Sequence, residues 1–179
     1  MNCTFERVFF DRVLLGEQEI RERVDLLAKE LATYTDDDGF VLVVILKGAL
    51  MFAADLSRRI PSQCSIDFLT VSSYYGGTQS TGNVHIVDGH SAEVYGKKVL
   101  VVDDIFDTGL TLQTVVKFLE QKGAQEVRTC VLLKKKKVRG VPFEVDYHAF
   151  EIEDEFVVGY GLDYQGEYRK LPYVGVMKT

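Results

Sequence analysis

The chain has 179 residues, a length that suits one globular domain with its own core rather than two. Hydrophobic residues make up 46% of it and charged residues 27%, a balance that excludes a disordered or fibrous protein. The formal net charge of −6 argues against a nucleic-acid partner, because such binding depends on neutralising phosphates with lysine and arginine.

Membrane and disulfide classes are not expected either. No segment approaches the roughly 20 apolar residues that span a bilayer, and the first seven residues are too polar for a secretory signal. The three cysteines, Cys3, Cys64 and Cys130, are odd in number and lack the CxxC spacing of a zinc ribbon. We therefore expect a cytoplasmic protein with reduced thiols and no membrane partner.

Helical and strand patterns alternate along the first half of the chain. Apolar residues at Ile20, Val24, Leu27 and Leu31 form one stripe of an amphipathic helix, and residues 40–46 form an uninterrupted β-branched run typical of a buried strand. The patterns predict, in order, a helix at 17–34, a turn at 36–39, a strand at 40–46 and a helix at 49–60.

The second half continues the alternation and then changes character. It predicts a strand at 64–72, a glycine-rich loop at 73–82, a hairpin return at 83–87, a strand at 98–102, a helix at 110–122 and a strand at 126–133. Short aromatic and β-branched runs follow residue 141. We expect one α/β domain over residues 1–179, with a mainly parallel sheet flanked by helices and a small hood built from the two termini.

The most informative segment is 99–112, in which an apolar strand leads to two carboxylates, a turn and a helix start. Asp103 and Asp104 at such a strand tip can accept hydrogen bonds from the two hydroxyls of a ribose. Residues 107–111 offer backbone N–H groups, two hydroxyls and a helix N-terminus, which together suit a phosphate group. The alternative is that Asp107 or Thr108 only caps the helix and that the acidic pair is solvated.

The DDxxDTGxT pattern resembles the motif with which type I phosphoribosyltransferases bind 5-phosphoribosyl-1-pyrophosphate (PRPP). Further segments, in the right order, narrow the resemblance to the hypoxanthine-guanine phosphoribosyltransferase family over about residues 41–176. These are Leu46-Lys47-Gly48, Ser73-Tyr74, Lys135 two residues beyond a Leu-Leu pair, the 156–164 segment, and Arg169. The resemblance implies the type I phosphoribosyltransferase fold.

By that resemblance the chain transfers a phosphoribosyl group to a purine base. Asp107 is the implied catalytic acid or base at purine N7. Lys135 is implied to donate to the O6 atom of a 6-oxopurine, which disfavours adenine. Phe156 is implied to stack on the base, with Val157 contacting it through its backbone. The implied purine-binding set is Lys135, Glu155, Phe156, Val157 and Asp163.

The resemblance also implies a PRPP-binding set, a metal ion and a lid. The PRPP-binding set is Lys47, Gly48, Asp103, Asp104, Ile105, Phe106, Thr108, Gly109, Leu110, Thr111 and Arg169. In the family the peptide bond before the lysine of the Lys-Gly pair can be cis. Magnesium would be bound by Asp163, Asp103 and Asp104. A loop opened by Ser73 and Tyr74 would close over the site to exclude water.

The sequence departs from the family at two positions. Asp103 stands where many members have glutamate, and Leu110 stands where some have lysine. Asp103 is shorter but still accepts hydrogen bonds, and the backbone of the turn does not depend on Leu110. Because PRPP is itself an anion and the chain carries a net negative charge, magnesium and nearby cations are expected to offset the repulsion.

Three alternatives remain open from the sequence. The base could be hypoxanthine, guanine or xanthine, which the motifs do not rank. The chain could be a non-catalytic regulator of this fold that binds nucleotide or RNA, although its acidic charge speaks against RNA. It could also be a signalling receiver domain, although the acidic pair then stands unusually late in the chain. The resemblance implies a homodimer or homotetramer.

Overall fold

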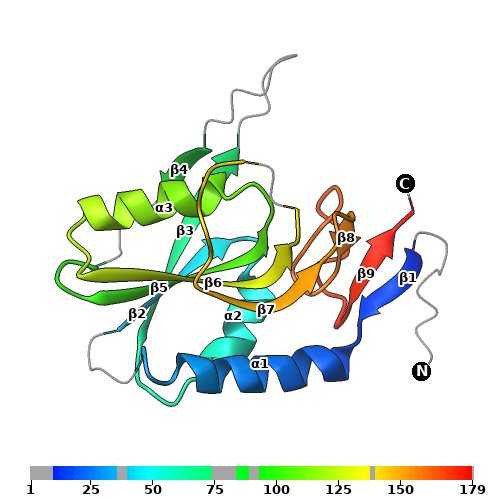
Figure 1. Cartoon of the computed structure of the whole chain (residues 1–179), viewed down its shortest axis with the longest axis horizontal. Helices are drawn as coiled ribbons and strands as arrows, with labels where there is room; N and C mark the ends of the chain where they lie inside the picture. Colours follow the sequence, from blue (N-terminus) through cyan, green and yellow to red (C-terminus); the bar gives the residue numbers. More distant parts are fainter. Residues whose placement is uncertain (1–9, 36–39, 74–83, 89–92, 138–139, 179) are drawn as a thin grey trace.

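The computed structural model describes residues 10–35, 40–73, 84–88, 93–137 and 140–178. A six-stranded sheet forms its centre, with helices on both faces, and a three-stranded sheet lies at one end (Figure 1). The central order is β4 (Val84–Asp88), β3 (Ser65–Ser73), β2 (Val41–Leu46), β5 (Lys98–Phe106), β6 (Glu126–Lys135) and β7 (Tyr147–Ile152). Neighbouring strands are parallel except β4, which runs antiparallel to β3.

The central strands are buried on both faces, and for this reason helices cover both faces of the sheet. Side chains alternate between the faces of a strand, so Leu42 and Leu100 join one core cluster while Val43 and Val101 join the other. The first cluster packs against α1 (Glu17–Leu31) and α2 (Leu50–Ser57). The second packs against α3 (Leu110–Gln121). Both faces of β2 and β5 are thus removed from water, which confirms the predicted three-layer α/β arrangement.

A hood made from both ends of the described chain covers the end of the sheet at which β2, β5 and β6 finish (Figure 1). Its strand order is β1 (Phe10–Leu15), β9 (Val174–Met177) and β8 (Val157–Val158), all antiparallel. The predicted hood from the two termini is confirmed. Ligands of parallel sheets bind beyond the carboxyl ends of the strands, so the hood faces the expected site.

Several predicted boundaries shift, and the largest shift affects the acidic pair. The strand expected to end at residue 102 continues to Phe106, because β6 offers partners as far as Lys134. Asp103 and Asp104 are therefore part of β5 and not of a turn after it. The helix expected at 49–60 is shorter, covering Leu50–Ser57, and the first helix ends at Leu31 instead of residue 34.

The proposed lid falls largely outside the described residues. Ser73, expected to open the loop, is instead the last residue of β3, where its backbone pairs with Val84. Tyr74 and the remainder of the loop lie outside the described residues.

Cys64 and Cys130 are free thiols. Of the helices in the described ranges, none has the length and apolar character needed to cross a membrane.

Candidate active site

Two adjacent carboxylates are held near the carboxyl end of β5, away from water. Asp103 is only 7% exposed, and its Oδ1 accepts a hydrogen bond of 2.9 Å from the backbone N–H of Asp104. Burial, and then repulsion from Asp104, raise the pKa of Asp103 well above its usual value. Burial also raises the pKa of Asp104, and the positive charge of Arg169 is one of the influences that oppose this rise. The alternative that both aspartates are solvated is therefore wrong, because Asp103 is buried.

The Lys47–Gly48 turn lies directly against this acidic pair. The Leu46–Lys47 peptide bond is cis, as the resemblance implied. A Cβ atom on Gly48 would lie 1.7 Å from Oδ2 of Asp104, so the position accepts only glycine. On its other side, Gly161 has a φ of +105°, and a Cβ there would lie 2.0 Å from the carbonyl oxygen of Gly48. The backbone of Gly48, the backbone of Gly161 and the side chain of Asp104, from three distant segments, therefore meet at this point.

Asp163 and Arg169 lie on the turn that follows Gly161. Arg169 pairs with Oδ1 of Asp163 at 2.6 Å and donates through Nη1 to the carbonyl of Gly161, also at 2.6 Å. The other oxygen of Asp163 accepts the N–H of Gly166 at 2.8 Å. The structure thus brings Asp163 and Arg169 next to Gly161, which lies against the Gly48–Asp104 contact.

Lys135 connects two carboxylates on the other side of the acidic pair. Its Nζ donates to Oδ2 of Asp107 at 3.2 Å and to Oδ1 of Asp154 at 2.9 Å. Its side chain is only 12% exposed, whereas Asp107 is 49% exposed. Desolvation lowers the pKa of Lys135, but the hydrogen bonds to Asp154 and Asp107 outweigh it, so the pKa is raised. Lys135 is therefore a charged, oriented donor beside an accessible carboxylate.

The turn between β5 and α3 has the form of an open backbone cradle. Gly109 is the N-cap of α3 with a φ of +77°, and it has no side chain with which to cap the helix. The alternative that Asp107 or Thr108 caps the helix is borne out only for Thr108, whose Oγ1 accepts a long hydrogen bond of 3.4 Å from the N–H of Leu110. The cradle residues are Ile105, Phe106, Asp107, Thr108, Gly109, Leu110 and Thr111. Phe106 is 1% exposed, so only its backbone is available to a ligand.

The predicted base-stacking residue, Phe156, is accessible. Its side chain is 47% exposed and meets the ring of Tyr164 edge-on, with centroids 5.8 Å apart. Its carbonyl accepts the N–H of Met177 at 3.0 Å, and the next residue, Val157, is buried in β8. Glu155 forms a two-pronged ion pair with Arg12 of β1, at 2.6 and 2.8 Å. The hood therefore fixes the segment that carries the aromatic ring.

Sequence reasoning missed three partners of these residues and one contact beside them. Asp154 holds Lys135, Arg12 holds Glu155, and Gly161 contacts the carbonyl of Gly48. Tyr160 reaches Asp55 on α2, as described below. Gly161 lies within the 156–164 segment that the family resemblance identified, and Asp154 lies next to Glu155; those positions were the available signal. Arg12 pairs across 143 positions, and no local pattern indicates such a contact.

Comparison with known proteins places the chain in a family. Residues 14–165 match the model of the phosphoribosyl transferase domain. The hypoxanthine-guanine phosphoribosyltransferase of Staphylococcus epidermidis is 43% identical over 171 residues, covering 93% of each chain. That of Bacillus subtilis is 40% identical, covering 94% of this chain and 93% of the relative.

Solved structures agree with these relatives. The crystal structure of a hypoxanthine phosphoribosyltransferase from Staphylococcus aureus matches with a TM-score of 0.89 at 41% identity, covering 94% of this chain and 92% of the other. The match confirms the type I phosphoribosyltransferase fold. A bifunctional protein TilS/HprT of Listeria monocytogenes is 42% identical, but the chain spans only about a quarter (26%) of its length. This chain belongs to the phosphoribosyltransferase family and, within it, to the hypoxanthine-guanine phosphoribosyltransferases.

Proposed function

We propose that the chain catalyses transfer of the 5-phosphoribosyl group from PRPP to N9 of hypoxanthine or guanine, releasing pyrophosphate, in purine salvage. The observation that carries this proposal is the contact between Lys135 and Asp107. A buried cation that can donate to a 6-oxo group lies 3.2 Å from an accessible carboxylate that can accept a proton from the same base. Named relatives with matching coverage support it.

The chemistry requires one bond to form, one to break and one proton to move. N9 of the purine attacks C1′ of the ribose, and the bond from C1′ to the pyrophosphate oxygen breaks with its electron pair going to pyrophosphate. As N9 becomes bonded, the proton on N7 passes to the carboxylate of Asp107. Phe156 stacks on the base and limits its position, which lowers the entropic cost of bringing N9 to C1′.

Lys135 accounts for the choice of a 6-oxopurine. Its ammonium donates a hydrogen bond to O6 of hypoxanthine or guanine. In adenine an amino group occupies that position, so two donors would face each other and one buried donor would stay unpaired. Because Asp107 and Asp154 hold the ammonium in place, its orientation does not have to be gained on binding.

The sugar and phosphate half consists of the 105–111 turn, the acidic pair, the Lys47–Gly48 turn and Arg169. Backbone N–H groups of the turn and the N-terminus of α3 bind the 5′-phosphate. Asp103 and Asp104 accept hydrogen bonds from the ribose hydroxyls. Arg169 and the Lys47–Gly48 turn bind pyrophosphate, and the Ser73–Tyr74 loop acts as the lid.

The residues of this half also fit magnesium. Within the described ranges, no three His, Cys, Asp or Glu side chains form a complete metal-binding group. Magnesium is usually held by one or two carboxylates together with substrate phosphates, so a full protein cage is not needed. Asp163, Asp103 and Asp104 remain the proposed ligands, but because they do not form one group of three, an ion would be held by one or two of them together with substrate phosphates. Burial raises the pKa of Asp103 and of Asp104, and a nearby cation would favour their ionised forms. The bound ion would offset the negative charge of PRPP.

We further propose that residues 1–179 act as one phosphoribosyltransferase domain that assembles as a homodimer or homotetramer in the cytoplasm. The hood supports a single unit, because β1 and β9 come from opposite ends of the chain and pair with each other. A neighbouring solved structure, a Trypanosoma cruzi hypoxanthine phosphoribosyl transferase at 36% identity, was studied for the effect of its C-terminal region on oligomeric state. Sedimentation of the purified chain measures the assembly.

The test of the proposed activity is formation of IMP or GMP from PRPP, the base and magnesium. Wild type is expected to be active, and Asp107→Asn is expected to lose roughly 10²-fold in rate, the usual effect of removing a general acid–base group. Asp154→Asn is the matched control, because Asp154 also binds Lys135 but has no proposed proton to transfer, so its loss should be smaller. Equal losses in the two variants would remove Asp107 from its proposed role.

A further inference from the structure

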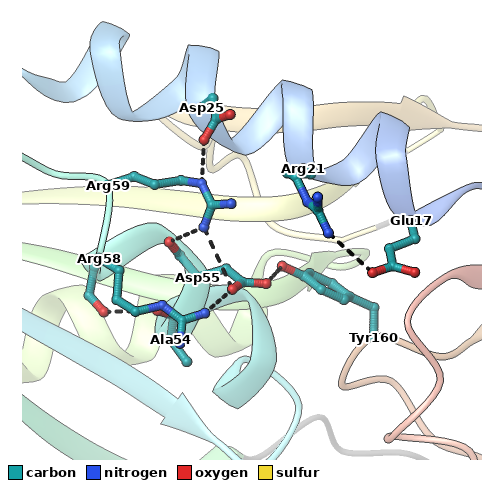
Figure 2. A network of polar contacts seen from close by, with 9 residues as sticks. Glu17, Arg21, Asp25, Ala54, Asp55, Arg58, Arg59 and Tyr160 are labelled. Carbon is teal, nitrogen blue, oxygen red and sulfur yellow. Dashed lines mark hydrogen bonds and ion pairs between the residues drawn. The ribbon is translucent and has the colours of Figure 1, made fainter.

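A network of polar contacts lies behind the proposed pyrophosphate half and joins α1, α2 and the turn after β8 (Figure 2). The hydroxyl of Tyr160 donates to Oδ2 of Asp55 at 2.5 Å. Asp55 also pairs with Arg58, and its backbone carbonyl accepts from Nη1 of Arg59 at 2.8 Å. Arg59 pairs in turn with Asp25 of α1. Asp55 is thus the residue at which the network meets the hood turn.

Tyr160 adopts an uncommon backbone conformation for a residue with a side chain. Its φ is +48°, in the left-handed region that costs free energy for L-residues other than glycine. The residue is 7% exposed, and burial raises the pKa of its hydroxyl far above the usual value, so the hydroxyl keeps its proton and donates to Asp55. Such a conformation persists only where surrounding contacts impose it.

The turn that Tyr160 fixes is the one that carries the phosphate-binding residues. The backbone N–H of Tyr160 donates to the carbonyl of Leu171 at 2.9 Å, and the N–H of the next residue, Gly161, donates to the carbonyl of Arg169 at 2.9 Å. Arg169 returns a bond through its side chain to the carbonyl of Gly161. A displacement of Tyr160 would therefore move Arg169 and, with it, the paired Asp163.

Asp55 lies on α2, the helix that follows the Lys47–Gly48 turn. The helix follows directly from the Lys47–Gly48 turn: the N–H of Leu50 donates to the carbonyl of Lys47 at 3.3 Å. The hood turn and the α2 segment therefore touch at two places. Gly161 lies on the carbonyl of Gly48, and Tyr160 bonds to Asp55. The Gly161–Gly48 contact involves two residues without side chains. The hydrogen bond between Tyr160 and Asp55 therefore fixes the hood turn against the α2 segment.

We propose that Tyr160 and Asp55 form a positioning pair, which holds Arg169 at the distance from the Lys47–Gly48 turn that pyrophosphate binding requires. The pair touches no reacting atom. The proposal rests on the proposed function, because it assigns the pyrophosphate group to that turn. It predicts a selective defect: pyrophosphate and PRPP bind more weakly, whereas a nucleotide product, which lacks pyrophosphate, binds as before.

Tyr160→Phe tests this pair with the least disturbance, because it removes one oxygen and keeps the ring. Binding of magnesium pyrophosphate and of IMP is measured by titration calorimetry for wild type and variant, with thermal unfolding as a check. We expect the Kd of magnesium pyrophosphate to rise about tenfold, which corresponds to ~1.4 kcal/mol, and the Kd of IMP to change less than about twofold. The KM of PRPP should rise in parallel with the Kd of magnesium pyrophosphate, while kcat should change less.

Two further variants make the test specific. Asp55→Asn should reproduce the defect, and it replaces Tyr160→Phe if that variant fails to fold. The double variant should bind pyrophosphate no more weakly than the weaker-binding single variant, because the Tyr160–Asp55 bond is the interaction that both substitutions disturb. Arg21→Gln is the control. Arg21 pairs with Glu17 and lines the same surface hollow as Tyr160 and Asp55, but it forms no hydrogen bond or ion pair with either (Figure 2), so both Kd values should stay unchanged.

The outcomes separate the two proposals. If wild type binds neither ligand and forms no nucleotide, the proposed function is wrong. If wild type is active but Tyr160→Phe and Asp55→Asn weaken IMP and pyrophosphate equally, or weaken neither, the positioning pair is wrong and the proposed function stands.

Discussion

Lys135 differs from the lysines beside it in how much of its side chain water reaches. Its side chain is 12% exposed between two carboxylates, whereas that of Lys136 is 51% exposed and pairs with Glu153 on the surface. A buried charge with fixed partners can select a ligand, because an unsuitable group opposite it stays unpaired at full desolvation cost. Surface pairs of the second kind contribute little.

We therefore expect Lys135→Gln to lower kcat/KM for hypoxanthine by about tenfold or more, since a charged, oriented donor to O6 is lost. The preference for hypoxanthine over adenine should fall with it. Lys136→Gln should change kcat/KM by less than about twofold. Initial rates with both bases measure this. A comparable effect from both variants would mean that charge in the whole lysine run, rather than one placed donor, recognises the base.

Residue types in the site were more predictable from the sequence than their partners. The motif identified Asp107, Lys135 and Arg169, and the structure places each beside other predicted residues. The burial of Asp103 was not predictable, because it depends on β6 extending alongside the end of β5. Local patterns carry periodicity, whereas burial depends on what packs from elsewhere in the chain.

At the scale of elements, the junction of β2, α2 and β5 depends on one close approach. Gly48→Ala would place a methyl group 1.7 Å from Oδ2 of Asp104, so the turn or the strand must shift. We expect a loss of about 1–3 kcal/mol in the free energy of unfolding, the usual range for forcing atoms into a packed site. Urea unfolding followed by circular dichroism measures the loss.

Gly16→Ala is the control for this substitution. Gly16 precedes α1, has a φ of −77°, and nothing lies within 4 Å of a Cβ added there. Its cost should stay below about 1 kcal/mol, which reflects only the weaker helix-capping preference of alanine. If Gly48→Ala were no more costly than Gly16→Ala, the acidic pair would have room to move, and the close contact would not constrain the site.

Long, strongly patterned elements were predictable, and short, non-local ones were not. The run at 40–46 and the helix beginning at Leu110 were placed within one residue of β2 and α3. The hood was expected from the termini, but its strands were not assigned. β8 has only two residues, and β1 pairs with β9 from the other end of the chain. Such strands form because a partner strand from elsewhere in the chain pairs with them, and two residues are too few to show an alternation of apolar and polar side chains.

The molecule as a whole carries a net charge of −6 and has to bind a substrate that is itself an anion. Local cations offset part of the repulsion between the chain and this substrate, because Lys47 and Arg169 lie on the two turns that meet at Gly48. Asp103 and Asp104 lie at the same place, and each adds a negative charge there when its carboxyl group is ionised. A divalent cation shared between these carboxylates and the phosphates of PRPP would convert repulsion into attraction.

Binding of PRPP should therefore stabilise the fold only when magnesium is present. At a free PRPP concentration of 100 times Kd, linkage adds about 2.7 kcal/mol to the free energy of unfolding. For a chain of this size that corresponds to a rise in Tm of roughly 5–10 °C. With EDTA the rise should nearly vanish, and sodium chloride at matched ionic strength should not restore it, because screening weakens repulsion without bridging the two anions. Differential scanning calorimetry measures this for the ligand-free chain and for the chain with PRPP plus magnesium, plus EDTA, or plus EDTA and sodium chloride. An equal rise in Tm with EDTA present would show that the lysines and Arg169 bind PRPP unaided, and the assignment of magnesium to Asp163, Asp103 and Asp104 would have to be given up.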